Sequence, residues 1–171
     1  MSAFVGGLLS PLMTPTHALA LLALGLLVGQ QRANTPSIAA FIAGLAAGLV
    51  AIARAVGETW APDILLAATT VGAGLIALAP PLPRLVPAAL AAIVGVALGL
   101  DSPPEVISVA SAIAMLVGSG FGAGLAVAVI AAVAQHLTRW WQRLGLRIVG
   151  SWIVASAVLV LALRYARGLM F

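Results

Sequence analysis

Long apolar stretches without a charged residue are the feature that most limits how this chain can fold. Only 7% of its 171 residues are charged and 63% are hydrophobic, whereas a soluble domain carries about 25% charged residues. So little polar surface cannot cover a domain in water, but it suits a lipid bilayer. One crossing needs about 20 apolar residues, so the length allows about six crossings with short loops. The sequence therefore predicts an all-α, polytopic transmembrane helix bundle that forms a single domain over residues 1–171.

Ten prolines separate the apolar stretches. Proline is tolerated in the first turn of a helix and disfavoured in its interior, so these residues mark helix boundaries. Six spans are predicted between them, with five or seven as alternatives. They lie near residues 17–29, 37–53, 64–79, 85–100, 106–137 and 148–163. Residues 3–13 predict a separate interfacial or re-entrant helix before the first span. This segment has no basic stretch and no small-residue cleavage site, so it is not interpreted as a signal peptide.

The charged residues divide between the two sides that six spans define. One side receives five arginines and no acid, namely Arg32, Arg84, Arg139, Arg143 and Arg147. The other side receives three arginines and all four acids. The positive-inside rule makes the first side cytoplasmic and places both termini outside, in the periplasm if the membrane is a bacterial inner membrane. Aromatic residues near the span ends are expected to anchor the helices at the interfaces; they are Trp60, Trp140, Trp141, Trp152 and Tyr165.

Glycines recur four residues apart in four of the predicted spans. In lipid, close approach of helix backbones supplies much of the packing energy between helices, and small residues at this spacing allow it. The candidate packing residues are Gly25, Gly29, Gly44, Gly48, Gly95, Gly99, Gly118 and Gly122. They predict a tightly packed bundle, or close contact with another membrane protein.

Motifs of catalysis are missing from the sequence. It contains no cysteine, no metalloprotease motif and no phosphate-binding loop. The four acids, Glu58, Asp63, Asp101 and Glu105, fall in predicted loops, where a solvated role is expected. An ion-coupled transporter usually keeps an ionisable group inside the membrane. In this sequence no acid lies in the middle of a predicted span. The sequence therefore favours a protein that is not an enzyme, needs no cofactor and binds the lipid bilayer rather than nucleic acid.

The two histidines are the remaining candidates for chemistry. His17 opens the first span and lies about one helical turn after Met13. Imidazole and thioether together are ligands for a borderline divalent metal, although a stable site needs further donors. An interfacial or hydrogen-bonded histidine is the alternative, and it is favoured more strongly for His136 than for His17.

The stretch 4–25, FVGGLLSPLMTPTHALALLALG, resembles the N-terminal signature of the HupE/UreJ hydrogenase and urease accessory proteins. That signature runs approximately HPxxGxDHxxAM, and Pro11, His17, Ala20 and Gly25 match it in register. Residues 147–163 resemble the closing helix of the family. The resemblance implies a small bundle of about six spans that acts as a nickel permease or nickel-delivery protein, with His17 among the ligands. The remaining motif positions are occupied by Ser10, Thr14, Thr16 and Leu21.

Two functions follow as expectations. The substituted ligands and the lack of a mid-membrane acid slightly favour a non-catalytic accessory or structural subunit, with membrane-protein partners in a larger complex. The family resemblance supports the alternative, a permease that carries nickel or another divalent metal.

Overall fold

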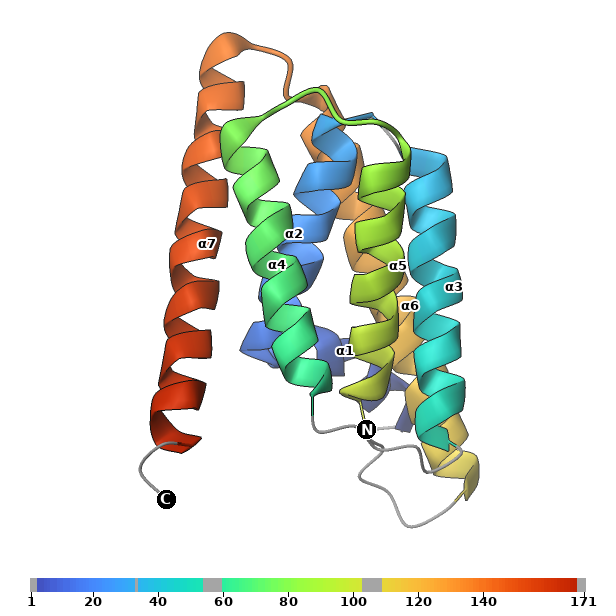
Figure 1. Ribbon diagram of the computed structural model, residues 1–171. Helices are drawn as coiled ribbons and strands as arrows, with labels where there is room; N and C mark the ends of the chain where they lie inside the picture. Colours follow the sequence, from blue (N-terminus) through green and yellow to red (C-terminus); the bar gives the residue numbers. More distant parts are fainter. Residues whose placement is uncertain (1–2, 33, 54–59, 103–108, 169–171) are drawn as a thin grey trace.

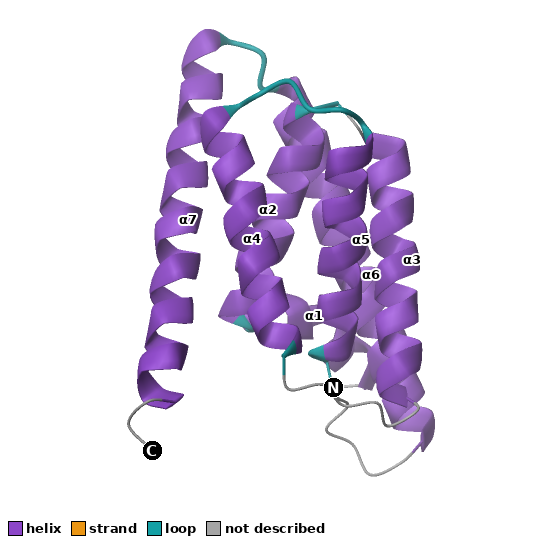
Figure 2. Ribbon diagram, viewed as in Figure 1, coloured by secondary structure: helices purple, strands orange, loops and turns teal. Residues whose placement is uncertain are grey.

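The computed structural model describes residues 3–32, 34–53, 60–102 and 109–168. All regular secondary structure in these ranges is α-helix (Figure 2), which confirms the predicted all-α fold class. The helices are α1 (Ala3–Met13), α2 (Pro15–Gln30), α3 (Asn34–Ala53), α4 (Ala61–Leu78), α5 (Leu85–Leu100), α6 (Val109–His136) and α7 (Trp140–Gly168).

Four of the described helices, α3, α4, α6 and α7, are long and apolar enough to cross a membrane. α1 and α2 meet the same test only as a pair, which is bent by 78° at the single residue between them. α5 is apolar but has only 16 residues. Membrane-crossing helices are thus present, while the number of crossings remains a prediction.

The largest difference from the predicted boundaries is at the start of α7. The expected span begins at residue 148, but α7 begins at Trp140 and has 29 residues. Arg143 and Arg147 lower the hydropathy of the first two turns without lowering their tendency to form a helix. Hydropathy therefore marks the apolar part of α7 and misses the turns before it. The start of the predicted span 106–137 falls outside the described residues.

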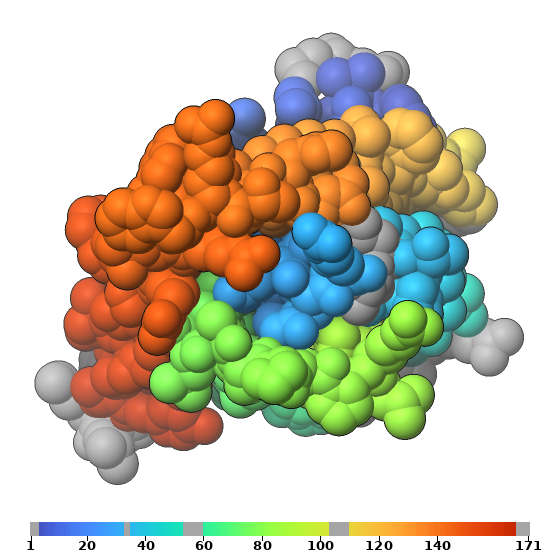
Figure 3. Space-filling model, turned by 90° about the horizontal axis from the view of Figure 1, so that it is seen from above, coloured from blue at the N-terminus to red at the C-terminus, as the bar shows by residue number. Residues whose placement is uncertain are grey.

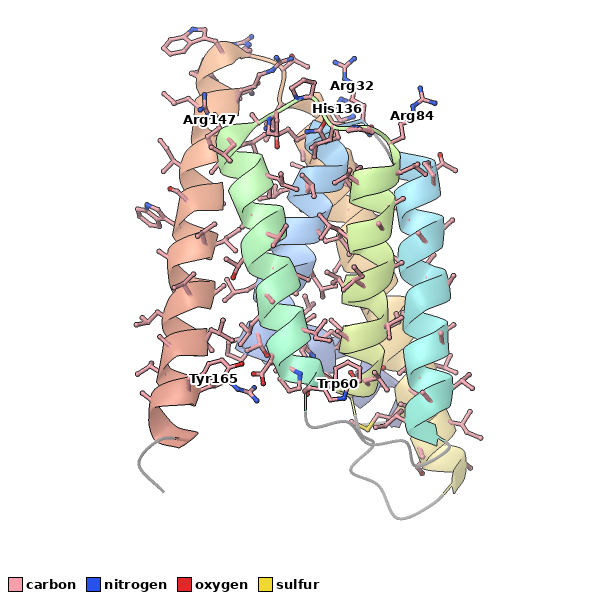
Figure 4. The ribbon with its side chains drawn as sticks, viewed as in Figure 1. Arg32, Trp60, Arg84, His136, Arg147 and Tyr165 are labelled. Atoms are coloured by element: carbon pink, nitrogen blue, oxygen red, sulfur yellow. The ribbon has the colours of Figure 1, made fainter. Side chains whose placement is uncertain are left out.

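The described acidic residues lie at one end of the bundle, and most of the arginines lie at the other. Figure 4 places Arg32, Arg84, His136 and Arg147 at one end, which we call the arginine end. Trp60 and Tyr165 lie at the other, which we call the acidic end because it holds Asp63 and Asp101. α1 and the last turn of α7 also lie at the acidic end (Figure 1). Glu58 and Glu105 fall outside the described residues.

The eight candidate packing glycines all lie against another helix. A β-carbon on Gly44 or Gly48 of α3 would meet α5 backbone, and one on Gly95 or Gly99 of α5 would meet α3 backbone. Gly118 and Gly122 of α6 face α1 in the same way, and Gly25 and Gly29 of α2 face α6. The helices approach to backbone contact because these positions carry no side chain.

α2 occupies the centre of the bundle. Ten of its 16 residues are buried, and it contacts every other helix. Its apolar residues join both clusters of the core, one around Leu21, Phe41 and Leu98 and one around Leu27, Ile76 and Ile153. His17 is one of these buried residues of α2.

Candidate functional site

The bend between α1 and α2 places His17 in the first turn of α2. Pro15 has no backbone N–H and cannot donate the next hydrogen bond of α1. The chain therefore turns at Thr14, and a new helix begins. The Thr14 hydroxyl donates to the carbonyl of Ser10 at 3.3 Å, which closes the end of α1. His17 follows two residues after Pro15 and is only 4% exposed.

The partner of His17 is Asp101, 84 positions away in the sequence. Nε2 of His17 lies 2.9 Å from Oδ2 of Asp101. The histidine side chain is 5% exposed and the aspartate side chain 25% exposed. When the carboxylate is ionised, Nε2 carries the hydrogen and donates it. The pair therefore ties the start of α2 to the end of α5.

Asp101 is the residue that ends α5. Its backbone N–H donates to the carbonyl of Ala97 at 3.0 Å, and the hydroxyl of Ser102 donates to the carbonyl of Leu98 at 2.7 Å. A negative charge at a helix C-terminus is unfavourable, because the helix dipole is negative there. The position of Asp101 is thus not explained by the stability of α5, but it is explained by the contact with His17.

Nδ1, the second ring nitrogen of His17, is buried and has no partner among the described residues. A neutral imidazole that donates from Nε2 leaves Nδ1 as an acceptor, and a buried acceptor without a partner is costly. Buried polar groups in proteins are nearly always hydrogen-bonded. Nδ1 is therefore an acceptor that no described group satisfies, while Nε2 on the other side of the ring contacts Asp101.

Asp63 forms the other ion pair among the described side chains, and it behaves differently. Its Oδ1 lies 3.1 Å from Nε of Arg164, and the two side chains are 34% and 41% exposed. Asp63 also lies in the first turn of α4, where the helix dipole favours a negative charge. A pair this exposed contributes little to stability. The helix dipole and the contact with Arg164 account for the position of Asp63.

The metal ligands proposed from the sequence lie in different surroundings. Met13 is 74% exposed at the end of α1, whereas His17 is buried. No group of three or more His, Asp or Glu side chains that could hold a metal ion occurs in the part of the chain that the structure describes. The described site offers one free ring nitrogen, Nδ1 of His17, and a carboxylate, that of Asp101, which is hydrogen-bonded to the other ring nitrogen. Metal binding by Met13 and His17 together stays a prediction.

Sequence reasoning placed Asp101 in a solvated loop beside Glu105 and missed its contact with His17. The contact depends on which helices are neighbours, and hydropathy does not determine that. One signal was present: His17 opens the first predicted span and Asp101 closes the fourth, so both residues were assigned to the same side of the membrane.

Little empty space is found between α2, α4 and α5 among the described residues. A cavity of only about 10 Å³ lies between α2, α4 and α5, with Leu24, Thr69 and Val94 in its walls. The hydroxyl of Thr69 donates to the carbonyl of Leu65 at 2.6 Å and so is satisfied within α4. The centre of the bundle is therefore apolar and tightly packed in this conformation.

The tryptophans expected at the interfaces point away from the core. Trp60 precedes α4 at the acidic end and is 43% exposed, and Trp140 and Trp141 begin α7 and are 77% and 54% exposed. Trp152 is 73% exposed. It lies five residues after Arg147 in α7, and so about 7.5 Å further along the helix from the arginine end.

The chain matches no known family model, no curated protein and no solved structure in comparisons with each. Its function must therefore be inferred from its own residues.

Proposed function

We propose that this protein is an integral membrane permease for a small cation, with His17 and Asp101 as its entry site. The observation that supports this most is the pair of buried His17 with Asp101, in which Nδ1 of His17 has no partner among the described residues. Ionisable groups in membrane helices are costly and usually mark an ion or substrate path. Broken helices such as α1 and α2 commonly form transport sites. The resemblance to the HupE/UreJ proteins favours the same function.

The proposal includes six crossings, with the bent pair α1–α2 counted as one. Successive helices from α2 to α7 run in alternating directions between the two ends (Figure 1). Arg32, Arg84 and Arg147 at the arginine end make that end cytoplasmic by the positive-inside rule. Both termini are then periplasmic, and the membrane is a bacterial inner membrane.

The cargo that suits these donors is a borderline divalent metal such as nickel. Imidazole nitrogen binds such ions, a carboxylate on the opposite ring nitrogen orients the imidazole, and water completes the coordination. A permease must release what it binds, so a site with few protein donors fits transit better than a closed set of four. Because little empty space is found between these helices among the described residues, passage requires a second conformation in which α2 separates from α4 and α5.

Uptake of nickel into proteoliposomes tests the proposal. We expect His17→Ala and Asp101→Asn each to slow uptake about tenfold or more, since each loses a charge-assisted contact. The matched controls are His136→Ala and Asp63→Asn, which change the same residue types elsewhere and should transport at the wild-type rate. Wild-type uptake no faster than in empty vesicles, or equal uptake by the His17 variant, would contradict the proposal.

An accessory subunit is the second candidate, and the observation that favours it is a wide apolar groove. The groove lies between α3 and α6, has a volume of about 730 Å³ and includes Ile42, Leu49, Val117, Phe121 and Leu125 in its lining. A membrane helix of a partner subunit can pack into such a surface.

Gentle extraction from the native membrane tests the accessory function. A partner should co-purify in stoichiometric amount, and Phe121→Ala should release it, whereas Val158→Ala on exposed α7 should not. A chain that purifies alone from the native membrane would exclude this function.

A further inference from the structure

A polar pocket opens at the arginine end, opposite the histidine–aspartate pair. It has a volume of about 370 Å³ and lies among the end of α2, the α4–α5 connection, the end of α6 and the start of α7. Figure 3, which looks onto this end, shows the end of α2 between the segments around α6 and α7 and the connection from α4 to α5. The pocket is separate from the proposed entry site and does not depend on it.

Three arginines from two parts of the chain line this pocket. Arg32 follows the end of α2, and Arg143 and Arg147 lie in the first two turns of α7. Nε of Arg147 donates to the carbonyl of Ala77 at 2.7 Å, which holds that guanidinium at the pocket wall. Among the described residues, neither Asp63 nor Asp101 is near, because both lie at the acidic end. The positive charge in the pocket is therefore not balanced by a described carboxylate.

The backbone of Arg32 adopts a conformation that arginine rarely takes. Its φ is 52°, in the left-handed region, directly after the end of α2. Glycine or asparagine normally occupies this position after a helix. The side chain of the preceding residue, Gln31, helps to fix the turn: it donates to the carbonyl of Pro80 at 2.9 Å and accepts from the N–H of Leu82 at 3.4 Å. A residue held in an unfavourable conformation often has a function that its side chain supplies.

Topology alone does not explain this grouping. The positive-inside rule requires arginines on one side of the membrane, but it does not require three of them to line one pocket. Arg84 and Arg139 belong to the same end, yet neither lines the pocket. They provide a natural comparison with Arg32 and Arg143, which do.

We propose that the pocket binds one phosphate group through Arg32, Arg143 and Arg147. Guanidinium groups bind phosphate in a planar, two-pronged arrangement, and several of them around one anion are typical of phosphate recognition. Thr138 adds a hydroxyl donor, and Leu137 and Leu146 add an apolar wall. The same chemistry fits the headgroup of an anionic phospholipid and a soluble phosphate, and the experiment separates these two sources.

Binding is measured with the full chain in phosphatidylcholine nanodiscs. In one arm a fraction of phosphatidylglycerol is added and the lipid retained per chain is counted by native mass spectrometry. In the other arm inorganic phosphate is titrated and the shift in Tm is recorded. We expect the double variant Arg32→Gly with Arg143→Gln to lower the affinity about tenfold or more in the arm that wild type responds to. The control double variant, Arg84→Gln with Arg139→Gln, removes the same charge from the same end and should behave as wild type.

Retention of phosphatidylglycerol identifies a lipid headgroup as the occupant, and a Tm shift with inorganic phosphate identifies a soluble one. Equal losses in the two double variants would show diffuse charge attraction and overturn the proposal, as would the absence of binding in both arms. Arg32→Gly also separates binding from folding. Glycine adopts a φ of 52° without strain, so this variant should keep or raise Tm without ligand while losing the response to it.

Discussion

Gly122→Ala should destabilise the protein by about 1–3 kcal/mol, whereas Gly124→Ala should not destabilise it. Both glycines belong to α6. A β-carbon on Gly122 would meet the backbone of α1 at Leu8, while nothing lies within 4 Å of one on Gly124. α1 is tied to α6 by backbone contact, so the added methyl group must push the two helices apart. At Gly124 the alanine gains from its higher helix propensity instead.

Thermal unfolding of the purified variants in one detergent measures both effects. Gly118→Ala, on the same face as Gly122 and against Phe4, should match Gly122→Ala. If the Gly122 and Gly124 variants unfold at the same temperature, α1 does not pack on α6 as described.

Removal of either member of the histidine–aspartate pair should cost nearly as much as removal of both. His17→Ala leaves the Asp101 carboxylate without its donor, and Asp101→Ala leaves a buried imidazole with no partner for either nitrogen among the described residues. A buried group left unpaired pays its full desolvation cost, whereas the double variant leaves neither group. The interaction energy in this double-mutant cycle should be about 1–3 kcal/mol.

The same unfolding measurement on four proteins completes the cycle. Asp101→Asn is the conservative control, because its amide oxygen still accepts from Nε2 and should recover part of the loss. Single effects that add within about 0.5 kcal/mol would mean that the two side chains act independently. The cycle reports on the contact itself, whether or not the pair carries a cation.

The helices were predictable because their causes are local. The thickness of a bilayer and the apolar composition determine how long each helix is. The prolines at 15, 62 and 87 show where α2, α4 and α5 begin, to within a few residues. α7 was predicted too short because Arg143 and Arg147 end the apolar stretch but not the helix. Hydropathy measures where a helix meets lipid, and the backbone continues beyond that point.

The candidate site was only half predictable because it depends on helix neighbours. His17 was identified by its residue type and by the resemblance, but Asp101 was assigned to solvent. Glycine spacing predicted that helices meet closely at Gly44 and Gly95 without naming the partner helix of either. The three arginines of the phosphate pocket also come together only in the fold, since Arg32 is more than a hundred positions from Arg143.

The lengths of the central helices have an electrical consequence. α2 and α5 have 16 residues each and rise about 24 Å, less than the roughly 30 Å of hydrocarbon in a bilayer. Asp101, a quarter exposed, ends α5 at one side, and Gln31 and Arg32 end α2 at the other. With the six crossings proposed above, the membrane voltage would fall over a thinner layer along the axis of the protein than in the lipid around it. A charge that moves along this axis experiences a stronger field than one crossing the bilayer, and 100 mV is worth about 2.3 kcal/mol per unit charge over that shorter distance.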